Sequence, residues 1–382
     1  MSFTPFIQQT PAMKTIAREG AVDCLAAELA LLRVRRPLLV CSGSVLRSPL
    51  HGRVRSQLEG LAVLEAPAIP AHSCADLVER LTAGSAEHRV DGIVAVGGGS
   101  CSDTAKAVAL LLAEGGRLAD HATRFTAPSD LRAPALLQPK LPIVTIPCTA
   151  SGAEVTSSLG IRAADGSKLL FTDPQLASRV VLLDPRANLD VPVAIMLATG
   201  MNGLAHCVEG LYSKVRSPLA EVLAIDGIGR FARALPALRR NPDDVAQRGE
   251  LLLAAHLSGL VLVNARTCLH HAICHAIGSV TGVSHGDANA VMLPHALAFN
   301  RAAVQPQLDR AAVALGRGGD FIAGLRELAA ELEVPTRLRD IGVPREALDR
   351  VATKTLGERG LFFNPRTVRS ADEILMVLEQ AY

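Results

Sequence analysis

Six of the eleven histidines fall between His206 and His285, and four of the six form a pattern with chemical meaning. Asn202 and His206 are four residues apart, as are His271 and His275, so each pair would share one face of a helix. His285 follows in a Gly/Ser loop. Histidine pairs at this spacing, completed by Asn, Asp or a third His, are frequent metal ligands. A single histidine is usually a hydrogen-bonded core residue, which is how we interpret the two others, but four together favour a functional site.

A glycine-rich turn provides a second candidate site. The stretch GIVAVGGGSCSDTAK runs from an apolar segment into Gly97, Gly98 and Gly99, then Ser100 and Asp103, which resemble a helix capping box. Glycines let the backbone approach a ligand, and the start of a helix offers free N–H groups and a positive dipole end. The pattern is neither GxGxxG nor a Walker motif, so a tight strand-to-helix turn remains the alternative to a phosphate site.

A hydroxyl-rich loop follows the next apolar run. In TIPCTASGAEVT, Thr145, Thr149 and Ser151 supply hydroxyls and Gly152 a permissive backbone. Ligands of parallel sheets bind at the carboxyl ends of the strands, so we expect this loop and the glycine turn to face one crevice.

The segments around these loops predict the architecture. Up to about residue 185, apolar runs that suit buried parallel strands alternate with helical patterns. The apolar runs are 37–41, 92–96, 141–146 and 179–183, and the helical patterns are 74–83 and 104–113. After Pro185 only helical spacing remains, over 192–212, 218–239, 245–267, 310–332 and 371–382. We therefore predict an α/β domain of doubly wound type over 1–185 and an all-helical domain over 186–382, with the site between them.

The composition excludes several classes of protein. A formal net charge of +2 over 382 residues gives no basic surface for nucleic acid, and 49% hydrophobic residues exclude a mostly disordered chain. The longest apolar stretch, 251–263, is too short to cross a bilayer, and the first residues lack an export signal. Eight cysteines without a CxxC pair indicate reduced thiols. We expect a soluble cytoplasmic protein with no membrane partner.

Four motifs taken together resemble the iron-containing alcohol dehydrogenase superfamily, and within it the maleylacetate reductases: GGGSCSDTAK, IPCTASGAE, MNGLAHCVEGLY and HHAICHAIG with the HG that follows. The resemblance implies a dinucleotide-binding α/β domain, a helical catalytic domain, a role in aromatic compound catabolism and a homodimer or larger homo-oligomer. The residues that would hold NAD(P)H are Gly97, Gly98, Gly99, Ser100, Asp103, Thr145 and Thr149.

The same resemblance assigns the histidines. Metal-dependent members bind iron or zinc through an Asp and three His, at positions that correspond here to Asn202, His206, His271 and His285. His275 matches a histidine placed near the nicotinamide and the reacting oxygen.

Asn202 is the most informative departure, because an amide offsets none of the charge of a divalent ion. The maleylacetate reductases, which this chain resembles, also carry Asn at this position and need no tightly held metal. We therefore expect no tightly held metal in this protein. His271 and His275 would then polarise the substrate, oriented by His206 and His285.

Three further departures leave the substrate and the cofactor open. Cys148 replaces an expected threonine, and the stretch HHAICH lacks a lysine expected after its second histidine. Arg266, which we place on the same helix face as His270, could replace that cation for a dicarboxylate, or be a solvated arginine. The end of the first strand (LLVCSGSVLR) has no acidic residue, which allows NADP as well as NAD.

The leading prediction is an NAD(P)H-dependent reductase that transfers hydride to a small unsaturated keto acid or a related carbonyl compound. A metal-dependent alcohol dehydrogenase is one alternative. The other is a non-redox member of the fold, similar to dehydroquinate synthase-like cyclases, that acts on a biosynthetic intermediate.

Overall fold

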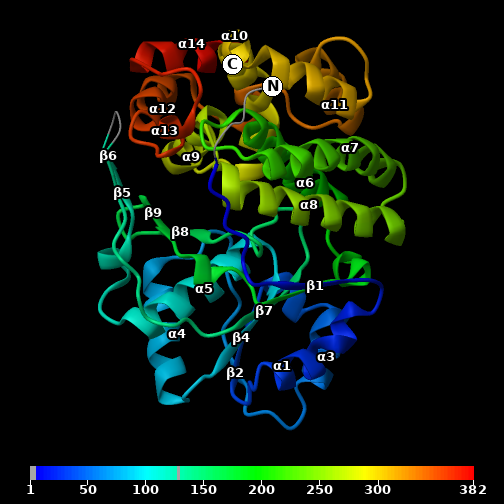
Figure 1. The fold of residues 1–382 in the computed structure, drawn as a ribbon, viewed down its shortest axis with the longest axis vertical. Helices are drawn as coiled ribbons and strands as arrows, with labels where there is room; N and C mark the ends of the chain where they lie inside the picture. The colour runs from blue at the N-terminus through cyan, green and yellow to red at the C-terminus, as the bar shows by residue number, and fades with distance from the viewer. Residues whose placement is uncertain (1–5, 127–129) are drawn as a thin grey trace.

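A six-stranded parallel sheet forms the first part of the chain in the computed structural model, which describes residues 6–126 and 130–382 (Figure 1). In spatial order its strands are β1 (Lys14–Ala17), β10 (Val180–Leu183), β7 (Ile143–Pro147), β4 (Gly92–Gly97), β2 (Pro37–Cys41) and β3 (Leu64–Glu65). All neighbouring pairs are parallel, with Val94 opposite both Leu39 and Val144 at the centre. The central strands are buried throughout, which is why they are continuous apolar runs in the sequence.

Helices cover both faces of this sheet. One face packs against α4 (Ala75–Glu87) and α5 (Gly99–Glu114), and the other against α1 (Leu25–Leu31), α2 (Gly43–Leu46) and α3 (Pro49–Gln57). The two apolar clusters share the sheet, with alternate strand residues pointing to each. This arrangement confirms the predicted doubly wound α/β architecture.

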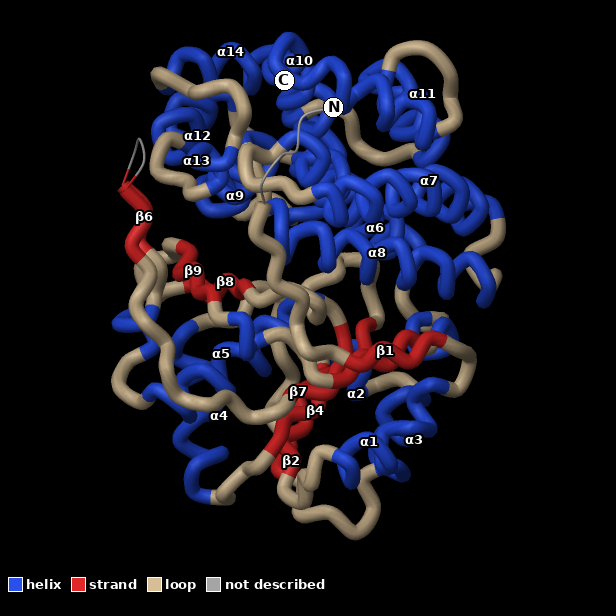
Figure 2. The backbone as a smooth tube through the Cα atoms, viewed as in Figure 1, coloured by secondary structure: helices blue, strands red, loops and turns tan. Residues whose placement is uncertain are grey.

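Two antiparallel hairpins, which the sequence patterns did not predict, extend from this part. They are β5 (Arg124–Thr126) with β6 (Asp130–Arg132), and β8 (Ser158–Arg162) with β9 (Lys168–Thr172). In Figure 2 the β8–β9 hairpin lies between α5 and α9.

The second part of the chain is helical, as predicted. Its helices are α6 (Val193–Tyr212), α7 (Pro218–Arg240), α8 (Val245–Ala265), α9 (Leu269–Thr281), α10 (His285–Leu315), α11 (Phe321–Leu332), α12 (Leu348–Thr355), α13 (Gly360–Phe363) and α14 (Ala371–Ala381). Short 3-10 turns join the elements: η1 (Ala21–Cys24), η2 (Leu118–His121), η3 (Pro174–Leu176), η4 (Pro185–Asn188), η5 (Leu338–Ile341) and η6 (Arg345–Ala347). The largest apolar cluster is built mainly from α6, α7, α8, α10 and α11.

Two of the predicted helical ranges were wrong, one in its interior and one at its end. The stretch 310–332 is not one helix, because Gly316, Gly318 and Gly319 all adopt positive φ and separate α10 from α11. The stretch 245–267 ends at Ala265, since Arg266 also has positive φ.

Among the described residues, none of the single helices is long and apolar enough to cross a membrane. Helices α8 and α9 pass that test only as a pair, and they are bent by 104° at the break between them.

Candidate functional site

The glycine turn and the loop after β7 meet at the carboxyl edge of the sheet, as predicted. A Cβ added to Gly98 would lie 3.2 Å from Thr149 Cγ2, and one added to Gly99 would lie 3.4 Å from Ser151 Oγ. Gly97 has φ +140°, and its added Cβ would lie 2.8 Å from Cys101 Sγ. Side chains at these three positions would press against the neighbouring residues and cover the backbone of the turn. Glycines leave that backbone open to a ligand.

Helix α5 begins at Gly99 with Gly98 as its N-cap residue, and its first turn contains no acidic residue. Its free N–H groups and dipole therefore face the half-buried glycine turn without a competing carboxylate. This cradle fits the pyrophosphate of a dinucleotide.

Asp103 and Thr145 have other partners. The predicted capping box is absent from this helix start, because Asp103 accepts a hydrogen bond from Gly160 N (3.2 Å) and so ties α5 to β8. Thr145 lies within β7, 1% exposed, and its Oγ1 is 2.8 Å from Ser178 Oγ. The structure thus gives both residues a packing role and leaves their predicted contact with a cofactor untested.

The loop after β7 also joins the sheet to the helical part. Gly152 has φ +66°, and an added Cβ would lie 2.4 Å from the Ala255 carbonyl oxygen in α8. Thr199 Oγ1 of α6 accepts a hydrogen bond from Ala150 N at 3.1 Å. Because α6 carries Asn202 and His206, these contacts set the distance between the glycine turn and the histidines.

The four predicted histidines come together from three helices. His206 in α6 stacks on His271 in α9, with ring centroids 4.7 Å apart. His285, the first residue of α10, lies 5.9 Å from His271 and 5.4 Å from His275. His271 and His275 are 6.2 Å apart along α9. Burial lowers the pKa of all four rings, and the neighbouring histidines lower it further for His206, His271 and His285, so the rings are mostly neutral at pH 7.

Glu209, a residue that the sequence patterns did not single out, fixes His271. Its Oε2 lies 2.7 Å from His271 Nδ1 and accepts from Cys268 N, while Oε1 accepts from His270 N. Burial raises the pKa of Glu209 and lowers that of His271. The pair is best described as a carboxylate that accepts Nδ1–H from a neutral ring. His271 Nε2 lies 3.1 Å from Asn202 Oδ1, and because Nε2 carries a lone pair in this tautomer, a hydrogen bond between them requires the amide to present its Nδ2–H₂ group instead.

Glu358 plays the corresponding role for His275. Its Oε2 lies 3.3 Å from His275 Nδ1, and the two side chains are 15% and 18% exposed. Burial raises the pKa of Glu358, but the hydrogen bond and charge of His275 outweigh it and leave that pKa below its usual value. The hydrogen bonds that orient the two rings therefore come from Glu209 and Glu358, and not from His206 and His285 as predicted.

Lys168 brings a positive charge to the same region from the β8–β9 hairpin. Burial is the largest cause of the lowered pKa at His271, His275 and His285, and the Lys168 charge lowers the pKa of each further. A Cβ at Gly160 would lie 2.2 Å from Lys168 Cε, so the glycine lets this side chain lie across the hairpin.

Arg266 is not on a helix with His270, as the sequence pattern had suggested. It lies between α8 and α9 at φ 66° and ψ 165°, a conformation almost confined to glycine. Burial lowers its pKa, and burial followed by the Arg266 charge lowers the pKa of Arg359 to about 10. The two guanidinium groups are therefore close to each other, and both line a cavity of about 510 Å³.

This cavity spans the two parts of the chain. Thr172 and Pro174 line it from the sheet part, and Val263, Arg266 and Arg359 from the helical part. None of the four clustered histidines lines it, but Arg359 directly follows Glu358, the partner of His275. The Arg359 charge also lowers the pKa of His275, so this side of the cavity lies near the histidine cluster.

Known proteins share this arrangement over the whole chain. Residues 12–185 match the family described as iron-containing alcohol dehydrogenase, and residues 196–382 match the C-terminal region of the Fe-containing alcohol dehydrogenase family. The chain belongs to the iron-containing alcohol dehydrogenase family. It is an oxidoreductase by this membership and by its relatives.

Several members are similar over nearly their full length. Maleylacetate reductase of Pseudomonas knackmussii is 31% identical over 99% of this chain and 97% of its own. The 4-hydroxybutyrate dehydrogenase of Cupriavidus necator is 30% identical over 95% of this chain and 96% of its own. The crystal structure of maleylacetate reductase from Agrobacterium tumefaciens matches with a TM-score of 0.84 at 28% identity, over 100% of this chain and 99% of that one.

The family name implies a metal, which the residues of this chain do not fit well. Within the described ranges, the one trio of ligand-type atoms closer than 4.8 Å is Glu209, His270 and His271. Both Glu209 oxygens already accept backbone hydrogen bonds. At the family's metal positions, Asn202 brings no charge, and His206 Nδ1 is the one buried ring nitrogen of the set without a partner in the described chain. Three neutral imidazoles can hold zinc, so the departure that weakens this set is the amide of Asn202, which offsets none of the charge of a divalent ion.

Proposed function

We propose that the protein is an NAD(P)H-dependent reductase that transfers hydride to a small carbonyl compound carrying carboxylates, of the maleylacetate type. The observation that supports this most strongly is the pair of guanidinium groups of Arg266 and Arg359 beside the Glu358–His275 pair. Within the described chain neither arginine forms an ion pair with a carboxylate. Arg359 has the charge of Glu358 near it and Arg266 has no carboxylate near it, so the two partly buried cations together favour an anionic substrate, and a dicarboxylate would pair with both.

NADPH is the reductant that we propose. Ser42, at the end of β2, adjoins the glycine turn, since a Cβ on Gly97 would lie 3.2 Å from its Oγ. At the start of α2 a Cβ on Gly43 would lie 3.4 Å from Arg47 Nη1, so an exposed guanidinium lies close to the end of β2. We expect the adenosine ribose of the cofactor to reach this position. An arginine there favours a 2′-phosphate, whereas NAD-specific sites use a carboxylate.

The chain's own residues would position the substrate and move a proton. The bound cofactor supplies the hydride; everything else follows from the side chains described above. Arg266 and Arg359 hold the carboxylates, and the Lys168 charge stabilises the negative charge that develops on the substrate oxygen. His275, neutral at rest, passes a proton from water to the reduced substrate, and the Glu358 carboxylate stabilises the imidazolium form that carries the proton for the transfer. No step in this scheme passes through a metal ion.

The test is a matrix of two cofactors and two substrates. With maleylacetate as substrate, we expect the rate of NADPH oxidation to exceed the rate of NADH oxidation. With NADPH as cofactor, we expect the rate with maleylacetate to exceed the rate with succinate semialdehyde, which carries one carboxylate. Arg47→Gln should lower kcat/KM for NADPH by roughly tenfold or more and leave NADH almost unchanged, as loss of one charge-assisted contact predicts. Equal effects on both cofactors would contradict the role of Arg47.

Preference for succinate semialdehyde over maleylacetate would instead support an activity like that of the 4-hydroxybutyrate dehydrogenase relative. Cofactor binding without turnover of either substrate would favour the non-redox alternative. A homodimer and a cytoplasmic location remain predictions, to be checked by light scattering and by fractionation.

A further inference from the structure

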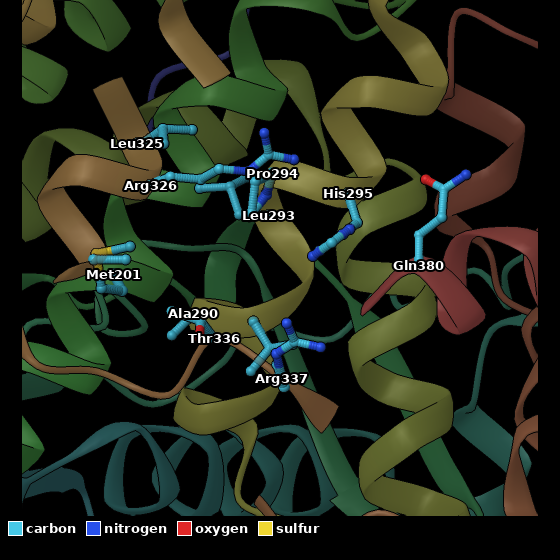
Figure 3. Close-up of a pocket in the computed structure, with 12 residues that line it drawn as sticks. Met201, Ala290, Leu293, Pro294, His295, Leu325, Arg326, Thr336, Arg337 and Gln380 are labelled. Atoms are coloured by element: carbon cyan, nitrogen blue, oxygen red, sulfur yellow. The ribbon is translucent and has the colours of Figure 1, made fainter. Parts of the chain in front are cut away.

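A second cavity, of about 340 Å³, lies in the helical part of the chain and shares no residue with the cavity beside the histidines. Figure 3 shows its lining side chains, which come from α6, α10, α11, α14 and the segment before η5. Apolar groups dominate one part of it, among them Met201, Leu293 and Leu325. Its volume is within the range of pockets that bind small molecules.

Three basic side chains from separate elements line the same space: Arg326 of α11, Arg337 before η5 and His295 of α10 (Figure 3). Burial, and then the charges of Arg326 and Arg337, lowers the pKa of His295 to about 4. Both guanidinium groups therefore lie close enough to act on one ring, which is neutral at pH 7.

The two arginines also lack counter-charges. Across the residues that the structure describes, neither forms a salt bridge or a side-chain hydrogen bond, although other arginines nearby do. Arg317 and Arg240 both pair with Glu331. The cavity is thus a positively charged space with an apolar lining in a region where other cations are neutralised.

We propose that this pocket binds a small organic carboxylate, at a site distinct from the catalytic cleft. Arg326 and Arg337, both exposed to solvent, would hold the carboxylate, since the planar guanidinium group matches its geometry. Met201 and Leu293 would contact the apolar body of the ligand. An inorganic anion would leave this apolar lining unused, which is why the lining points to an organic ligand.

The site adjoins two of the three helices that carry the family's metal positions, α6 and α10. Met201 directly precedes Asn202 in α6, and Ala290, which also lines the pocket, is five residues after His285 in α10. A ligand here would therefore contact the backs of helices whose other faces form the histidine cluster.

Calorimetric titration of the full chain with benzoate tests the proposal. We expect saturable binding that weakens at least about tenfold in the double variant Arg326→Gln/Arg337→Gln. The matched control is Arg350→Gln, an exposed arginine of α12 outside the pocket, which should bind like the parent. Benzoate could also enter the catalytic cleft, so the titration is repeated in Arg359→Gln, where the pocket's share of the binding should persist.

A measurement on the unaltered chain guards against misfolding of the variant. The sequence has six methionines, so a methyl-labelled sample gives few signals, and Met201→Leu identifies the one in the pocket. We expect that signal to shift on addition of benzoate. Any of three results would overturn the proposal: equal affinity for benzoate in the parent and the double variant, a Met201 signal that does not shift, or inorganic phosphate that binds as tightly as benzoate.

Discussion

Replacing Arg266 by glycine should make the protein more stable and a poorer enzyme. The backbone at this position, at φ 66° and ψ 165°, costs a non-glycine residue about 1–3 kcal/mol. Glycine removes that strain but loses about 0.5–1 kcal/mol through the greater freedom of the unfolded chain. The free energy of unfolding should therefore rise by up to about 2.5 kcal/mol in urea titrations.

The same change removes one of the two guanidinium groups from the substrate cavity. A hydrogen bond to a charged group contributes about 1.5–3 kcal/mol, so kcat/KM for maleylacetate should fall roughly 10- to 150-fold. Arg266→Ala separates the two effects, because alanine loses the charge but keeps a Cβ at positive φ. It should be as poor an enzyme as the glycine variant without the gain in stability.

Either of two results would refute this reasoning. If Arg266→Gly lowered the free energy of unfolding, the strain would not be stored at this residue. If both variants kept the parental kcat/KM for maleylacetate while Arg359→Gln lost it, Arg266 would be a structural residue and the dicarboxylate assignment would rest on one cation.

Three further changes test other parts of the account. Glu358→Gln removes the group that raises the pKa of His275, so kcat at neutral pH should fall roughly tenfold or more. The limb of the pH–rate profile that reports His275 should also move to lower pH. The control is Glu346→Gln, on the surface, which should change neither quantity. Asn202→Asp restores a carboxylate among the three histidines, and metal analysis after dialysis against zinc should show an ion retained by this variant and not by the parent. Lys106→Met leaves the buried carbonyl oxygens of Ala153, Thr156 and Ser158 without their donor and should lower the free energy of unfolding by about 3–5 kcal/mol in urea titrations, unlike a surface Lys→Met change.

The sequence was informative wherever one local pattern determined the structure. The buried strands β2, β4 and β7 are uninterrupted apolar runs, and the glycine turn directly follows one of them, so both the architecture and the meeting of the two loops could be predicted. The spacing of four between His271 and His275 likewise placed them together on α9.

The groups that orient the histidines could not be predicted, because nothing local distinguishes them. Glu358 is 83 residues from His275, and Glu209 is 62 residues from His271. Each is an ordinary acidic residue until the fold brings it to a ring nitrogen. Arg266 was misplaced for a related reason: its segment has helical composition, and only the chain's turn into α9 imposes positive φ. The β8–β9 hairpin is short and partly exposed, which weakens its apolar pattern.

The most direct test of the proposed function is oxidation of NADPH by maleylacetate before and after exhaustive treatment with a metal chelator. We predict turnover that is saturable in both substrates and unchanged by the chelator, with no stoichiometric metal in the active sample. Activity that disappears on chelation and returns with iron or zinc would contradict the metal-free mechanism, and absence of NADPH or NADH oxidation with any carboxylate-bearing carbonyl compound would contradict the reductase itself.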